Sequence, residues 1–156
     1  CTDDGYEDDD TYTEATPLAV NETQDHNLCF DNADWYRFEG FEGTVYQITT
    51  THDVTDGAEA DTQLILYDED GESIILFHEN GVTTDLTEDP LLYDFYETGQ
   101  PAEIVWRATR NGPYYVKVRT ATCDEDIVPY CEPSPQVSEN PPDGVGAQTA
   151  YTVTLQ

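Results

Sequence analysis

The chain has 156 residues, of which 34 are Asp or Glu and five are Lys or Arg, giving a formal net charge of −29. A surface this negative repels the phosphates of nucleic acids and of anionic membranes, which argues against both as partners. The hydrophobic fraction of 37% and the aromatic fraction of 12% are too high for a disordered acidic tail. We therefore expect a single folded domain over residues 1–156.

An acidic segment, residues 1–16, opens the chain and is followed by short runs of β-forming residues between turns. Most runs have a period of two: Tyr46 and Ile48, for example, alternate with Gln47 and Thr49. No long segment has helical periodicity, and no apolar run reaches transmembrane length. The expected strands are residues 24–30, 34–39, 44–51, 62–67, 73–78, 102–108, 114–121 and 149–155. About eight strands of this kind predict an all-β fold, a jelly-roll-like antiparallel β-sandwich.

Two stretches, residues 79–100 and 122–148, interrupt this rhythm, and we expect them to be long loops. The first contains an apolar cluster inside an acidic connection. Its members are Leu91, Leu92, Tyr93, Phe95 and Tyr96. This cluster either contacts a partner or folds back as an extra hairpin over its own sandwich.

The four cysteines lack the spacing of a zinc site, which favours disulfides and an oxidising, extracellular compartment. Three pairings are open. We expect Cys123 to pair with Cys131, because the two close a short loop, and this leaves Cys1 for Cys29. A lipid on Cys1 is the alternative, since anchored lipoproteins begin with a cysteine after cleavage.

Two groups of carboxylates are candidate metal ligands. Glu7, Asp9 and Asp10 lie on the acidic segment, and Asp31 and Asp34 flank a turn before an expected strand. Calcium prefers six to eight oxygen ligands, many of them carboxylates. The alternative is a solvated acidic face with an Asx turn at Asp31 or Asp34.

Four motifs, in order along nearly the whole chain, resemble those of bacterial pre-peptidase C-terminal domains. They are YEDDDT (6–11) with ATPL (15–18), HNLCFDNADWYRF (26–38), ADTQLILYDEDG (60–71), and IVWRA (104–108) with GPYYVKVR (112–119). The resemblance implies a jelly-roll β-sandwich in a secreted protein, where such domains accompany proteases or other extracellular enzymes. They are similar to collagen-binding domains of clostridial collagenases, in which calcium fixes the N-terminal segment onto the sandwich.

The resemblance also implies which residues bind the calcium. It assigns this role to one set, consisting of Glu7, Asp9, Asp10, Asp31, Asp34 and the carbonyl of Trp35.

The sequence does not point to an enzyme, because it has no nucleophile elbow and no His-Glu-x-x-His motif. Asn21 begins a sequon, Asn-Glu-Thr, and is the position where we expect any N-glycan. Two functions remain. One is a structural or adhesive module that self-assembles on the cell surface or as a filament subunit. The other is an accessory domain of a secreted hydrolase, which binds an extracellular protein or polysaccharide.

Overall fold

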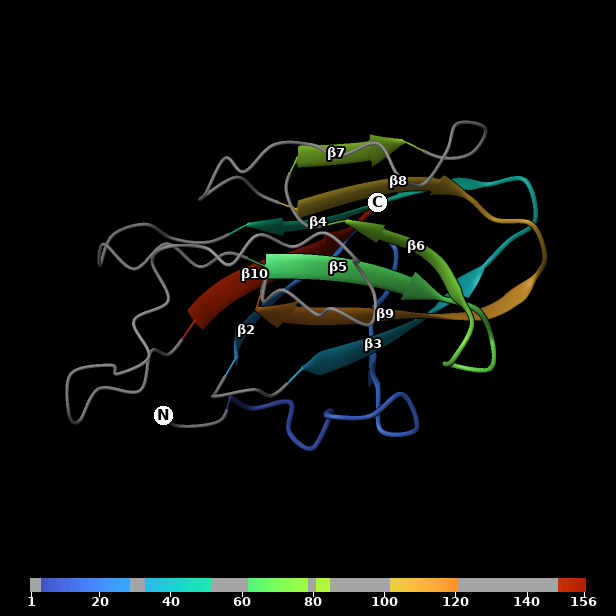
Figure 1. The fold of residues 1–156 in the computed structure, drawn as a ribbon. Coiled ribbons are helices and arrows are strands. Elements are labelled where there is room, and N and C mark those ends of the chain that lie inside the picture. The colour runs from blue at the N-terminus through green and yellow to red at the C-terminus, as the bar shows by residue number, and fades with distance from the viewer. Residues whose placement is uncertain (1–3, 29–32, 52–61, 79–80, 85–101, 121–148) are drawn as a thin grey trace, which may run out of the picture.

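A computed structural model describes residues 4–28, 33–51, 62–78, 81–84, 102–120 and 149–156. Ten strands in these residues form two sheets of five strands each (Figure 1). The sheet orders are β1-β3-β9-β5-β6 and β2-β10-β4-β8-β7. The strands are β1 (Thr16–Pro17), β2 (Glu22–Leu28), β3 (Asp34–Gly40), β4 (Val45–Thr51), β5 (Thr62–Tyr67), β6 (Ile74–His78), β7 (Gly81–Thr84), β8 (Ala102–Arg107), β9 (Gly112–Thr120) and β10 (Thr149–Leu155).

The predicted all-β, jelly-roll-like sandwich is confirmed, and each of the eight predicted ranges overlaps one strand. Two short strands, β1 and β7, were not predicted. β7 lies within residues 79–100, which the sequence analysis assigned wholly to a loop. Both strands lie at sheet edges and pair in parallel, β1 with β3 and β7 with β8. β1 has only two residues, one of them Pro17, and so gives no alternating pattern.

The main core lies between the two sheets and consists of the inward-facing residues of the alternating patterns. Tyr46 and Ile48 of β4 are buried, as their alternation predicts. The largest fully buried side chains of this core are Trp106, Tyr36, Tyr46, Tyr114, Leu28, Ile48, Leu64, Leu66, Ile104 and Leu155. Aliphatic and aromatic side chains from both sheets thus fill the interior.

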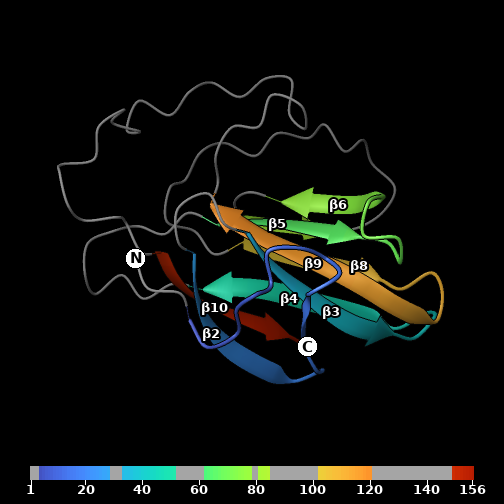
Figure 2. The same ribbon diagram turned by 90° about the horizontal axis from the view of Figure 1, so that it is seen from below.

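A second, smaller cluster lies on the outer face of the first sheet. Trp35, Ile65 and Tyr67 are buried there, with Tyr12 and Tyr115 packed against them. These side chains are buried on an outer face because the N-terminal segment crosses this face over β3 and β9 (Figure 2). All six residues of β5 are buried, although its sequence alternates.

Tyr12 attaches the N-terminal segment to this face. Its ring centroid lies 6.1 Å from that of Trp35 and 5.6 Å from that of Tyr115. Gly71, in the turn between β5 and β6, has a φ of +66°, and a Cβ there would lie 2.3 Å from the Tyr12 ring. Only glycine fits beside Tyr12 at this turn.

Among the described residues, no helix is long and apolar enough to span a membrane.

Candidate metal centre

Backbone hydrogen bonds hold the N-terminal segment, which includes β1, along the edge of β3 that faces away from β9. The Trp35 N–H donates to the Asp9 carbonyl at 2.9 Å, and the Leu18 N–H donates to the Arg37 carbonyl at 2.9 Å. The carboxylate of Asp4 accepts the N–H of Asn27 in β2 at 2.8 Å. The segment therefore bridges the two sheets at the ends where β3 begins and β2 ends.

Three carboxylates meet at this place. One carboxylate oxygen from each of Glu7, Asp9 and Asp34 lies within 4.8 Å of the other two. Asp9 and Asp34 are each only 1% exposed, and Glu7 is half-buried. Within the part of the chain that the structure describes, the buried Asp9 Oδ2 has no hydrogen-bond partner.

Burial makes the charges of this group costly. It raises the pKa of Asp34 to about 8; the nearby carboxylates of Asp9, Asp4 and Glu7 add to the rise, and a hydrogen bond from Tyr151 opposes it. Burial likewise raises the pKa of Asp9 to about 7, with Glu7 the largest charge contribution. No Lys or Arg of the described residues forms an ion pair with Asp9 or Asp34. A bound cation would remove this cost, since it favours the ionised form of every ligand.

The donors suit a hard cation. All three are carboxylate oxygens, the ligand type that calcium prefers, and the orphaned Asp9 Oδ2 supplies a buried oxygen without another role. The carbonyl of Trp35 lies on the same strand edge as its N–H, which bonds to the N-terminal segment. The residues present therefore fit a calcium ion, although its binding here stays a prediction.

The other predicted residues fare differently. Asp10 is exposed and lies outside the group of three, although its charge contributes to the raised pKa of Asp9. Asn21 is exposed in a turn, with a φ of 65°. Several positions lie outside the described residues, namely Asp31, the cysteines Cys1, Cys29, Cys123 and Cys131, and the apolar cluster Leu91, Leu92, Tyr93, Phe95 and Tyr96.

Sequence reasoning missed two residues of this region, Asp4 and His26. His26 was not among the predicted ligands, yet it is 4% exposed and its Nδ1 lies 4.0 Å from Asp34 Oδ2. The signal was present in β2, where Gln24, His26 and Leu28 form the buried face. A histidine on the inward face of a strand needs polar partners, and one of them here is Asp4.

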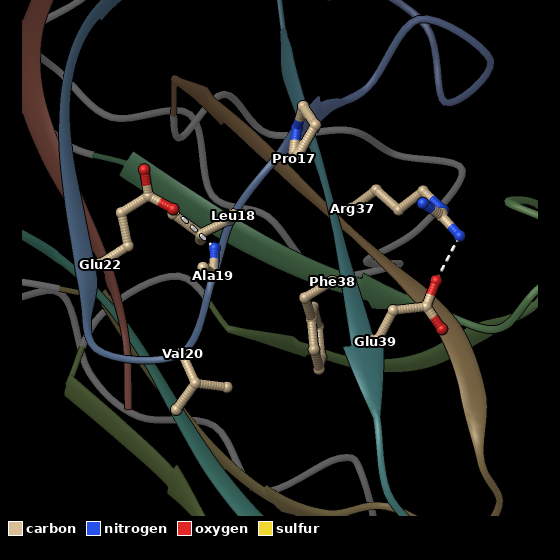
Figure 3. Close-up of a pocket in the computed structure, with 8 residues that line it drawn as sticks. All are labelled: Pro17, Leu18, Ala19, Val20, Glu22, Arg37, Phe38 and Glu39. Atoms are coloured by element: carbon tan, nitrogen blue, oxygen red, sulfur yellow. Dashed lines mark hydrogen bonds and ion pairs between the residues drawn. The ribbon is translucent and has the colours of Figure 1, made fainter.

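A surface hollow lies elsewhere, at the outer edge of β1 and β3 (Figure 3). It is an open hollow of about 360 Å³ lined by Pro17, Leu18, Ala19, Val20, Glu22, Arg37, Phe38 and Glu39. Arg37 pairs with Glu39, and the Glu22 carboxylate accepts the Ala19 N–H at 2.7 Å. Its charged lining residues are thus Glu22, Arg37 and Glu39.

No protein-family model and no curated protein matches the sequence. The fold, however, matches solved structures. The pre-peptidase C-terminal domain of collagenase from Bacillus anthracis superposes with a TM-score of 0.53 at 13% identity, covering 91% of this chain and 94% of that one. This chain has the fold of a pre-peptidase C-terminal domain. The resemblance inferred from the four motifs is thereby confirmed at the level of fold.

Other matches have different functions. CorA of Methylomicrobium album BG8, described as a surface-associated copper-binding protein, superposes with a TM-score of 0.55 at 12% identity over 91% of this chain and 98% of that one. PliG of Aeromonas hydrophila, a periplasmic inhibitor of g-type lysozyme, matches with a TM-score of 0.45 at 9% identity over 91% and 97% of the two chains. At these identities the collagenase domain and CorA show the fold alone and leave the function open.

Proposed function

We propose that this chain is a non-enzymatic, extracellular β-sandwich module whose N-terminal segment is fixed by calcium. The observation that carries the proposal is the convergence of Glu7, Asp9 and Asp34, with Asp9 Oδ2 buried and unpaired among the described residues. Glu7 and Asp9 come from the N-terminal segment, and Asp34 comes from β3. One cation bound between them would hold the segment on the sandwich.

Each further ligand has a place in this proposal. The carbonyl of Trp35 lies on the edge of β3 that carries the segment. Asp10, which follows Asp9 in the sequence, and Asp31, which precedes Asp34, would complete the coordination shell of the calcium. Calcium also neutralises part of the −29 charge, which otherwise opposes the compact state.

Calorimetric titration of the metal-free protein with CaCl₂ tests the proposal. We expect one tight site in the wild type. Asp9→Asn should weaken it at least tenfold, because it removes a buried charged ligand. Asp8→Asn is the matched control, since Asp8 is an exposed neighbour outside the group and should bind as the wild type does. Equal binding by both variants would remove Asp9 from the site.

We propose a structural or adhesive role for this module, through self-assembly at the cell surface or in a filament. The support is the apolar cluster in residues 91–96 within an otherwise acidic connection. Burying such side chains is worth about 1.5–3 kcal/mol each. Light scattering with and without calcium tests this role, and Tyr93→Ser with Phe95→Ser should prevent assembly. A wild type that stays monomeric at high concentration with calcium would contradict it.

A second candidate function is that of an accessory domain which binds an extracellular protein or polysaccharide. The similarity to the collagenase domain favours it. Co-sedimentation with insoluble collagen, in calcium and in chelator, distinguishes the two. Binding by a monomer supports the accessory role, and assembly without collagen binding supports the structural one.

A further inference from the structure

We propose that Asp4, His26 and Asp34 form a second metal site, which takes a late first-row transition-metal dication, Zn²⁺ or Cu²⁺, through the Nδ1 of His26. One ligand atom from each residue lies within 4.8 Å of the other two. This site rests on donors that the proposed calcium site does not use, except for the shared Asp34.

The hydrogen bonds of Gln24 fix the tautomer of His26. The Gln24 amide nitrogen donates to the carbonyl of Pro17 and to the carboxylate of Glu22, both at 3.0 Å. Its amide oxygen therefore faces His26, whose Nε2 lies 3.1 Å away. Because that oxygen only accepts, Nε2 must carry the hydrogen, and in a neutral ring Nδ1 carries the lone pair. Metal-binding histidines are commonly oriented in this way, by a hydrogen bond from the other ring nitrogen.

The lone pair of Nδ1 faces two carboxylates and has no hydrogen-bond partner among the described residues. Asp4 Oδ2 lies 3.5 Å from it and Asp34 Oδ2 4.0 Å. Three acceptors facing one another repel unless a proton or a metal ion lies between them.

Aromatic rings enclose the imidazole. Tyr6 stacks on it with centroids 4.2 Å apart, Tyr36 meets its edge at 4.9 Å, and Tyr151 lies at 5.8 Å. The side chain of His26 is 0% exposed. Water therefore has little access to satisfy Nδ1.

Both carboxylates are held in place by other groups. The two oxygens of Asp4 accept the N–H groups of Tyr6 and Asn27, at 2.9 and 2.8 Å. Asp34 Oδ2 accepts the hydroxyl of Tyr151 at 2.5 Å. Such outer contacts orient ligands and strengthen a metal site.

The donor set selects the metal. Calcium takes oxygen ligands, whereas imidazole with carboxylates suits zinc and copper. Ligand atoms about 2.05 Å from a tetrahedral zinc lie about 3.3 Å apart. The 3.5 and 4.0 Å separations from Nδ1 would contract by about 0.2 and about 0.7 Å to reach this value.

Titration of the full chain with ZnCl₂ and, separately, CuCl₂ in calcium-saturated buffer tests the proposal. We expect one equivalent of either metal to bind, with copper the tighter of the two. His26→Gln should weaken binding at least tenfold. His78→Gln is the matched control, because His78 belongs to β6 in the other sheet, and it should bind as the wild type does. Equal affinity of His26→Gln and wild type overturns the proposal.

Asp9→Asn separates this site from the calcium site, since it should weaken calcium and keep zinc. A second measurement covers a His26→Gln protein that fails to fold. The double variant His52→Gln, His78→Gln leaves His26 as the sole histidine of the three. Its Cu²⁺ complex should show nitrogen coupling from one imidazole in electron paramagnetic resonance. A spectrum without imidazole coupling overturns the proposal whatever the calcium titration gives.

Discussion

The interior between the sheets and the N-terminal segment with its carboxylates are built on opposite principles. In the interior, side chains such as Trp106, Tyr46 and Ile48 are almost fully buried, and their stabilisation comes from apolar burial and close packing. At the edge of β3, Asp9 and Asp34 are equally buried, but each brings a charge that the described residues do not neutralise. We therefore expect the interior to be indifferent to cations and pH, and the segment to depend on both.

Truncating the interior should have the largest effect. Trp106→Ala should cost about 3–5 kcal/mol of unfolding free energy, because it leaves a large cavity at a side chain that is 1% exposed. Chemical denaturation measures this loss, which should be the same with calcium as with chelator. Phe41→Ala is the control, since Phe41 is 63% exposed and should stay within about 0.5 kcal/mol of wild type.

Removing calcium should have the second largest effect. A ligand that binds only the folded state at about one hundred times its Kd contributes about 2.7 kcal/mol. Chelation should therefore lower the melting temperature of wild type and of Asp8→Asn alike. It should leave Asp9→Asn nearly unchanged, and an equal drop in that variant would contradict the assignment of Asp9.

The pH dependence of the metal-free protein should come third. In the unfolded chain Asp titrates near 3.8, but in the folded chain the pKa of Asp9 is about 7 and that of Asp34 about 8. Between pH 3.8 and about 8 the folded state therefore binds more protons than the unfolded chain. The stability of the fold falls as pH rises through this range and levels off above about 8.5. His26, whose pKa is lowered in the folded state, acts in the opposite direction up to about pH 7.5, because the unfolded residue titrates near 6.5.

Melting curves between pH 7.5 and 8.5 therefore isolate the two carboxylates. The fall should be present in chelator and absent in saturating calcium, where both carboxylates are ionised as ligands. In chelator, Asp34→Asn should reduce the fall of the melting temperature with rising pH. A fall of the same size in calcium would assign it to the general acidic charge.

The smallest effect should come from Tyr151→Phe. Its hydroxyl donates to Asp34 Oδ2 and also bonds to the Tyr36 hydroxyl, so its loss should cost about 1 kcal/mol. Because that hydrogen bond opposes the rise in the pKa of Asp34, the variant should release more protons on binding calcium. Titrations in buffers of different ionisation enthalpy measure the release. Unchanged proton release would separate Tyr151 from the site.

Local patterns were enough to predict most of the fold. The alternation around Tyr46 and Ile48 identified β4, and similar runs identified the other long strands, because inward residues of a half-buried sheet must be apolar. β1 and β7 were not predicted, because strands of two and four residues are too short to show an alternating pattern.

The candidate site was only partly predictable, because 34 acidic residues offer many possible clusters. The family resemblance selected Glu7, Asp9 and Asp34. It gave no reason to include Asp4 or His26, whose approach depends on the path of the segment across β2 and β3. That path is fixed by contacts far apart in the sequence, such as Tyr12 on Trp35, and no local pattern encodes it.

Amide hydrogen exchange followed by NMR tests the central claim most directly, because it reports on both regions at once. The Trp35 amide donates to the Asp9 carbonyl, and the Gln47 amide donates to the Gln156 carbonyl in the other sheet. Chelation should speed exchange at Trp35 at least tenfold and leave Gln47 within twofold, since only the segment is released. Equal protection of Trp35 with and without calcium would contradict the account.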